Sequence, residues 1–128
     1  MAWKLGPVGH FGLSVHDPNL SARWWIDKLG LEHQFDFDGG VAIGNDAVTI
    51  AFHRGRPAPA AVGHMSFHLG SMRELHEALA DLKAAGVALE DPGDEIGPEA
   101  SGSPHLGLWF HDPDGYRWEL SVQNGAKR

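Results

Sequence analysis

Apolar and polar residues alternate along residues 8–16, so that His10 lies on the opposite side of an extended chain from the apolar positions. Those apolar positions are Phe11, Leu13 and Val15. A period of two is typical of a strand with one buried face. The segment therefore predicts a strand whose other face carries a histidine.

The next segment has the signals of a helix over about residues 18–29. Asp17 supplies an N-cap, Pro18 takes the first helical position and Gly30 supplies the stop. The apolar stripe of this helix is expected at Leu20, Trp24 and Leu29. Three short strands separated by turn-forming residues are then expected near 31–37, 40–44 and 47–53.

The second half of the chain repeats this order. Residues 63–71 again alternate, with His64 opposite the apolar positions, and Ser71 caps a helix that runs to about Ala85. Its core positions are Leu75, Leu79 and Leu82, and further strands are expected at 87–90, 105–111 and 116–122. The spacing from strand histidine to helix cap is the same in both halves, which indicates a duplicated βαβββ unit with a period of about 54 residues.

These elements predict an α+β fold in a single domain over residues 1–128. Two tandem βαβββ modules, at about 5–54 and 62–123, would form a curved mixed sheet around a cavity. The stretch at 55–61 is too rich in proline for regular structure and is interpreted as the linker. Residues 124–128 are expected to be a short polar tail.

Charge and composition restrict the classes of function. A net charge of −7 disfavours binding to nucleic acid or to a membrane surface, and no apolar run has the length of a membrane helix, so a cytoplasmic protein is expected. With no cysteine and nine histidines, any metal would be bound by imidazole and carboxylate groups. Sheet edges that one module cannot close favour a homodimer.

Three candidate ligands point away from the expected helices. His10 and His64 do so in the two opening strands, and the alternation of the last strand places Glu119 on the same side, beside Arg117. Two histidines and one carboxylate form a facial site that leaves coordination positions open for substrate and water. Such a set suits Fe, Mn, Co, Ni and Zn alike, so the sequence predicts one divalent metal ion of unspecified identity.

Two stretches of the chain resemble the vicinal oxygen chelate superfamily of glyoxalases, bleomycin resistance proteins and extradiol dioxygenases. They are GHFGLSVHDPNLSARWWIDKLGLE near the beginning and FHDPDGYRWEL near the end. The resemblance covers nearly the whole chain and implies paired βαβββ modules around a metal ion. It also implies that His10, His64 and Glu119 occupy the metal-ligand positions.

The resemblance favours a centre with three protein ligands. Glutathione-dependent glyoxalases usually carry a fourth ligand on the last strand of the first module, where Thr49 is the expected repeat counterpart of Glu119. Threonine is a poor metal ligand, and Ser14 stands near the place of the basic residue that holds glutathione in those enzymes. Thr49 is therefore expected to contact substrate.

Other relatives suggest further roles. His53 resembles the acid–base histidine of extradiol dioxygenases, and Trp109 stands where those enzymes carry a tyrosine and could stack on an aromatic substrate. His111 shares the cavity-facing side of that strand, and Arg117 could hold a substrate carboxylate or pair with an acid. Fosfomycin transferases bind a phosphonate, which the acidic residues of the 91–104 loop would repel.

The sequence thus predicts a metal-dependent enzyme, a dioxygenase or a lyase or isomerase of the glyoxalase type, acting on a small molecule chelated through oxygens. The alternative is a non-catalytic binding protein for a drug such as bleomycin on the same scaffold. A fosfomycin-type thiol transferase is less favoured. The 91–104 loop is expected either to be a solvated mobile loop or to cover the site as a lid.

Overall fold

The computed structural model describes residues 2–127, which form two compact units divided between Pro57 and Ala58. The division lies inside the stretch that the sequence assigned to a linker. Each unit is described by itself. None of the helices within residues 2–127 is long and apolar enough to span a bilayer.

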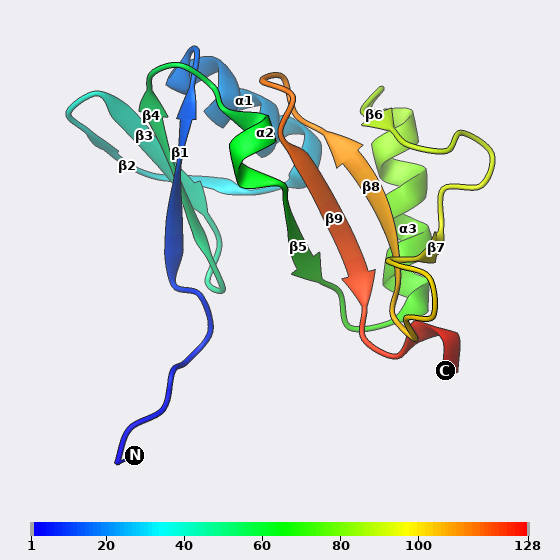
Figure 1. Cartoon of the computed structure of the whole chain (residues 1–128). Helices are drawn as coiled ribbons and strands as arrows, with labels where there is room; N and C mark the ends of the chain where they lie inside the picture. Colours follow the sequence, from blue (N-terminus) through cyan, green and yellow to red (C-terminus); the bar gives the residue numbers. More distant parts are fainter. Residues whose placement is uncertain (1, 128) are drawn as a thin grey trace. The chain divides into compact units, whose positions relative to one another are not determined.

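The first unit is a four-stranded mixed sheet with one helix (Figure 1). Strand β1 runs parallel to β4, and the other neighbouring strands are antiparallel, in the order β1-β4-β3-β2. The elements are β1 (His10–Val15), α1 (Pro18–Leu29), β2 (Glu32–Phe37), β3 (Gly40–Gly44) and β4 (Thr49–Arg54). Each lies close to the range that the alternation and turn signals predict.

Helix α1 begins and ends as its flanking residues predict, but it buries a different face. The Asp17 carboxylate accepts hydrogen bonds from the backbone N–H groups of Asn19 and Leu20, and Gly30 adopts the left-handed conformation with φ of 71°. The predicted apolar stripe is wrong at Leu20, which is 52% exposed. The buried residues are Pro18, Ser21, Ala22 and Trp25, since small side chains let the helix approach the sheet and Trp25 fills the space beside them.

The second unit repeats this topology. Its sheet has the order β5-β9-β8-β6, with β7 also paired to β8, and β5 runs parallel to β9. The elements are α2 (Pro59–Val62), β5 (His64–His68), α3 (Met72–Ala84), β6 (Ala88–Leu89), β7 (Gly97–Pro98), β8 (Leu106–His111) and β9 (Arg117–Val122). The shared strand order confirms the duplicated α+β module.

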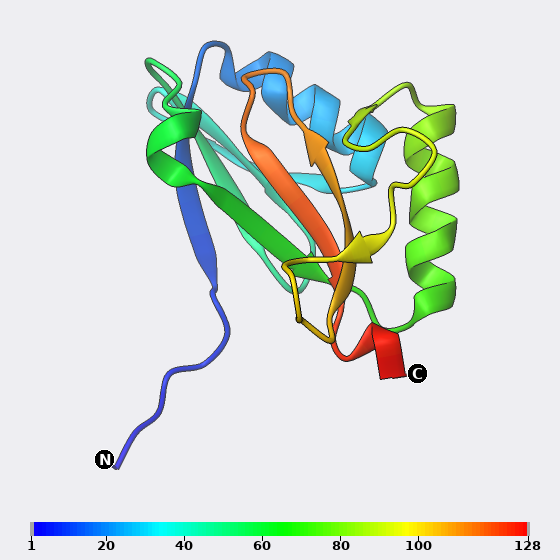
Figure 2. The ribbon, with the colours of Figure 1, turned by 45° about the vertical axis from the view of Figure 1, so that its right-hand side comes forward.

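Helix α3 packs along the second sheet (Figures 1 and 2). The Ser71 hydroxyl accepts a hydrogen bond from the backbone N–H of Glu74, whose carboxylate in turn accepts one from the backbone N–H of Gly70. Leu75 and Leu82 are buried, as predicted, while Leu79 is half-buried. On the sheet side, Phe67 and Trp118 stack with ring centroids 5.5 Å apart.

Three connecting segments are more ordered than the sequence indicated. Pro59 starts the short helix α2 within the predicted linker, because proline is well suited to a first helical position. Strand β7 pairs part of the 91–104 loop with β8, and Glu95 in this loop is buried beside Lys83, with 2.9 Å between carboxylate and ammonium. Within the predicted polar tail, Gly125–Lys127 form a 3-10 turn, and Arg128 lies outside the described residues.

The turn between β8 and β9 is organised by a buried aspartate. One oxygen of Asp112 accepts hydrogen bonds from the backbone N–H groups of Asp114 and Tyr116, and the other accepts one from the indole of Trp118. Burial raises the pKa of Asp112, and these hydrogen bonds oppose that rise. The DPDG sequence thus fixes the entry into β9, the strand that carries Glu119.

Replacing Asp112 should destabilise the second unit. We expect Asp112→Asn to lower the free energy of unfolding at pH 7 by about 2–4 kcal/mol. The side-chain NH₂ of asparagine would replace one carboxylate oxygen and could not accept the hydrogen bond that this oxygen accepts from an N–H group. Urea unfolding followed by tryptophan fluorescence measures the loss, with Asp27→Asn on the exposed side of α1 as the control. Equal stabilities for the two variants would contradict the assigned role.

Candidate metal centre

The predicted metal ligands lie on strands of both units. His10 begins β1 in the first unit, whereas His64 begins β5 and Glu119 lies within β9 in the second. In the second sheet His64 pairs with Arg117, and Glu119 follows Arg117 by two residues, so all three side chains share one face. The other face of that sheet carries Trp118 and packs toward α3.

Glu119 is a buried carboxylate with an unsatisfied oxygen. Its side chain is 1% exposed, and its Oε2 atom has no hydrogen-bond partner among the described residues. Gly107 on β8 leaves the space for it, because a Cβ there would lie 3.0 Å from that oxygen. A buried, unpaired carboxylate is costly, so this position suits a group that brings positive charge.

His64 offers an imidazole on the same face of the sheet as this carboxylate. It is exposed at the start of β5, and its ring forms no hydrogen bond with any described residue. The ring meets Trp109 edge to face, with centroids 4.9 Å apart. Imidazole nitrogen and carboxylate oxygen together form a donor set that suits divalent transition metals.

The complete predicted set is not contained in either unit. His64 and Glu119 share the second unit, and His10 belongs to the first. Across residues 2–127, no three histidine, aspartate or glutamate side chains gather closely enough to hold a metal ion. The role of His10 therefore stays a prediction from the strand pattern.

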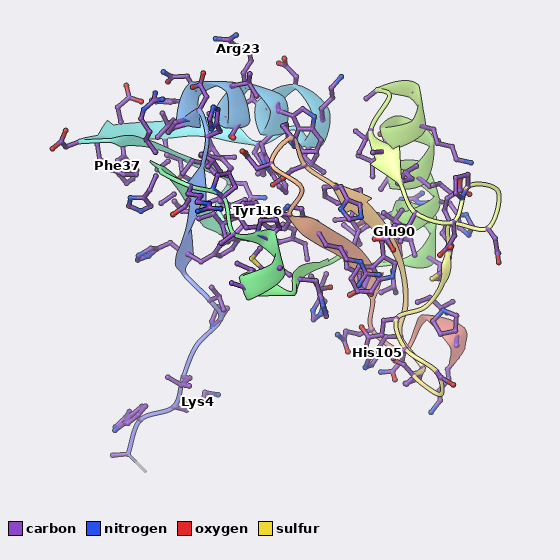
Figure 3. All side chains as sticks on the ribbon, turned by 45° about the horizontal axis from the view of Figure 1, so that its top comes forward. Lys4, Arg23, Phe37, Glu90, His105 and Tyr116 are labelled. Atoms are coloured by element: carbon purple, nitrogen blue, oxygen red, sulfur yellow. The ribbon has the colours of Figure 1, made fainter. Side chains whose placement is uncertain are left out.

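Arg117 is paired with an acid that the sequence analysis did not single out. Its Nε and Nη2 atoms donate to the two carboxylate oxygens of Glu90 over 2.6 and 2.9 Å, and His111 Nε2 lies 2.9 Å from the same carboxylate (Glu90 is labelled in Figure 3). The Arg117 guanidinium holds the pKa of Glu90 below its usual value, and Glu90 raises the pKa of Arg117. Glu90 directly follows β6. Its position at the end of an expected strand was the only feature of the sequence that could have indicated a role in the site.

The lowered pKa of Glu90 predicts a dependence of stability on pH. Ionised Glu90 should stabilise the fold fully above its ordinary pKa of 4.5, and this contribution should disappear as pH falls through the lower value in the folded protein. We expect Glu90→Gln to cost about 1 kcal/mol at pH 6, a modest figure because Arg117 is 38% exposed. Urea unfolding from pH 6 to pH 3 should show the difference from the unmodified protein shrinking below pH 4.5, and a constant difference would contradict the pairing.

The remaining predicted site residues lie on β4 of the first unit. Thr49 pairs with His10 in register and donates a hydrogen bond from its hydroxyl to Gln34 over 2.5 Å. His53 is exposed, with its ring centroid 4.9 Å from that of Phe37.

The strand register corrects one match made from the sequence. His10 pairs with Thr49 and His64 pairs with Arg117, so Thr49 corresponds to Arg117, and the counterpart of Glu119 is Ala51. Alternating strands look alike when displaced by two residues, which explains the error. Alanine offers no metal ligand, so the first module supplies no fourth ligand at this position.

Solved structures with the same fold cover nearly the whole chain. A lactoylglutathione lyase from Agrobacterium tumefaciens is 16% identical, with a TM-score of 0.73, over 94% of this chain and 96% of the other. A glyoxalase/bleomycin resistance protein/dioxygenase from Alicyclobacillus acidocaldarius is 13% identical, with a TM-score of 0.74, over 91% of this chain and 90% of the other. The oxidase ChaP-H2 is 24% identical, with a TM-score of 0.70, over 94% of this chain and 95% of the other. These likenesses show the fold alone.

Sequence comparison identifies the family. No curated protein sequence is significantly similar to the chain. A family model, in contrast, matches residues 8–120, which cover nearly all of both modules and include all three predicted ligands. The chain therefore belongs to the Glyoxalase/Bleomycin resistance protein/Dioxygenase superfamily.

Proposed function

We propose that this chain is a divalent-metal-dependent enzyme of the glyoxalase or dioxygenase type. It acts on a small organic substrate that is chelated through oxygens, and its protein ligands are His10, His64 and Glu119. Membership of the superfamily supports the reaction class. A lyase and an oxidase among the structures of the same fold are consistent with it.

The observation that carries the proposal is the state of Glu119. Its carboxylate is buried with Oε2 unsatisfied, and an imidazole without hydrogen-bond partners among the described residues stands on the same face of the neighbouring strand. A carboxylate that is buried for a structural reason normally accepts hydrogen bonds from donors of the protein. A cation held by Glu119 and His64 would satisfy it instead.

A bound divalent ion would supply a Lewis acid for the negative charge that develops on substrate oxygens. Glu119 and His64 would hold this ion from rigid strands, with His10 as the third ligand. Trp109 and His111 lie on the same face of the second sheet as Glu119 and His64, and we assign them to substrate contact. Thr49 is assigned to substrate contact and His53 to acid–base chemistry from the first module.

The charge on this face favours a neutral or weakly charged substrate. Arg117 was a candidate for binding a substrate carboxylate, but its guanidinium already forms two hydrogen bonds with Glu90. A substrate anion would have to displace Glu90, a competing carboxylate attached to the same sheet. We therefore assign Arg117 a place in the site without a direct bond to a substrate anion.

Metal analysis followed by an activity screen tests the proposal. Protein purified without chelator should contain about one divalent ion per chain. It should then turn over substituted catechols with oxygen uptake in air, or the methylglyoxal–glutathione adduct equally in air and under nitrogen. Efficient thiol transfer to fosfomycin would contradict the substrate class. Saturable bleomycin binding by metal-free protein without turnover would overturn the enzyme assignment in favour of a binding protein.

We also propose that the protein is a homodimer. Strands β1 and β5 each border a single strand within their own sheets, so each module has an open edge. Light scattering at micromolar concentration should give twice the chain mass of 13.9 kDa. A mass equal to that of one chain would contradict the dimer.

A further inference from the structure

The Trp109 side chain spans from one strand of the second sheet to another that is not its neighbour. Trp109 lies on β8 and pairs with Glu119 on β9, whereas His64 lies on β5, on the far side of β9. Strands two places apart are separated by about 10 Å. The indole and the imidazole together cross this gap, because their ring centroids lie 4.9 Å apart.

This ring contact takes the place of a hydrogen bond that metal-binding histidines usually have. Such a histidine commonly donates its second ring N–H to a carboxylate or carbonyl group, which fixes the orientation of the ring. The His64 ring has no such partner among residues 2–127, and its side chain is exposed. The near-perpendicular contact with Trp109, at 80°, is therefore the restraint that the second unit supplies.

The indole is also contacted by Arg117. The guanidinium carbon of Arg117 lies 3.7 Å from the centroid of the Trp109 ring, within the range of a cation–π contact. Glu90 fixes that guanidinium through two hydrogen bonds, and it also contacts His111. A planar group held along one edge by both oxygens of a carboxylate has little freedom to move away from the ring.

We propose that Trp109 is a positioning residue that orients His64 for metal binding, with Arg117 and Glu90 holding the indole in place. This inference rests on the proposed function, because it requires His64 to be a ligand. It gives the Glu90–Arg117 pair a purpose in the site that does not involve substrate charge.

The first test is the affinity for Ni²⁺, measured by calorimetry on the full chain. Trp109→Leu should weaken Ni²⁺ binding about 10- to 100-fold, the range found when groups that orient a ligand are removed. Trp3→Leu makes the same substitution at an exposed tryptophan and should leave affinity unchanged. If the unmodified protein binds Ni²⁺ and Trp109→Leu binds it equally well, the positioning role is overturned and the proposed function stands. If the unmodified protein does not bind Ni²⁺, both are overturned.

The second test needs no metal. The ring protons of His64, assigned by NMR with a His64→Gln variant, should be displaced by the indole ring current from those of His76, which is exposed on α3. In Trp109→Leu the His64 signal should move to the position of His76. Glu90→Gln keeps the indole but loosens Arg117, and it should move the signal in the same direction by less. An unchanged His64 signal in Trp109→Leu, or in Glu90→Gln if the first variant does not fold, would overturn the proposal.

Discussion

Glu119→Gln should abolish tight metal binding while leaving the fold intact. Removing a group that merely orients a ligand costs about 10- to 100-fold in affinity, so losing the charged ligand itself should cost about 100-fold or more for Ni²⁺, which corresponds to about 3 kcal/mol. Glutamine has nearly the same shape as glutamate, and the apolar face of β9 that packs toward α3 is unchanged.

The same variant should be more stable than the unmodified protein when metal is absent. With chelator present, Glu119 is a buried charge whose Oε2 has no partner among the described residues, and the neutral amide removes that penalty. We expect the free energy of unfolding to rise by about 1 kcal/mol in chelator. Glu77→Gln on the exposed side of α3 serves as the control and should change neither quantity. Lower stability together with normal Ni²⁺ affinity would show that Glu119 has a structural role.

His10→Ala should weaken Ni²⁺ binding by a similar factor, about 100-fold or more, although His10 belongs to the other unit. Its imidazole is the predicted third ligand, and a site with two protein ligands binds less tightly. His76→Ala removes an exposed histidine from α3 and should leave the affinity unchanged. Normal affinity in His10→Ala would remove His10 from the site and leave His64 and Glu119 as its protein ligands.

A mixture of two defective variants identifies the chain that supplies His10. His10→Ala and Glu119→Gln should each fail to bind metal tightly when alone. If His10 of one chain completes the site of its partner, each heterodimer contains one intact site, and tight Ni²⁺ binding returns after the variants are unfolded and refolded together. If every site is built within one chain, the mixture stays defective. Restored binding requires both the dimer and the ligand set proposed above, whereas a mixture that stays defective assigns all three ligands to one chain.

Local signals in the sequence predict the elements closely. The caps at Asp17 and Ser71 give the starts of both long helices, because a side-chain oxygen next to orphan N–H groups is a specific local feature. Strand parity correctly separates the face of Glu119 from that of Trp118, since successive side chains alternate by geometry alone.

Other features depend on contacts that local patterns do not encode. The buried face of α1 depends on which of its side chains pack against the sheet, and the apolar pattern alone wrongly predicts that Leu20 is one of them. The repeat match at Thr49 was displaced by two residues, because alternation has no unique register. Glu90 acquires its role only when β6 pairs with β8 and brings it to Arg117.

Anomalous diffraction from crystals soaked in Mn²⁺ tests the proposed metal centre most directly. A single strong peak should lie about 2.0–2.3 Å from the imidazole nitrogens of His10 and His64 and from a carboxylate oxygen of Glu119, with at least one position open to solvent. His10 can come from the same chain or from its partner. A well-ordered structure that shows no peak at Glu119, or a peak bound by none of these three side chains, would contradict the metal centre.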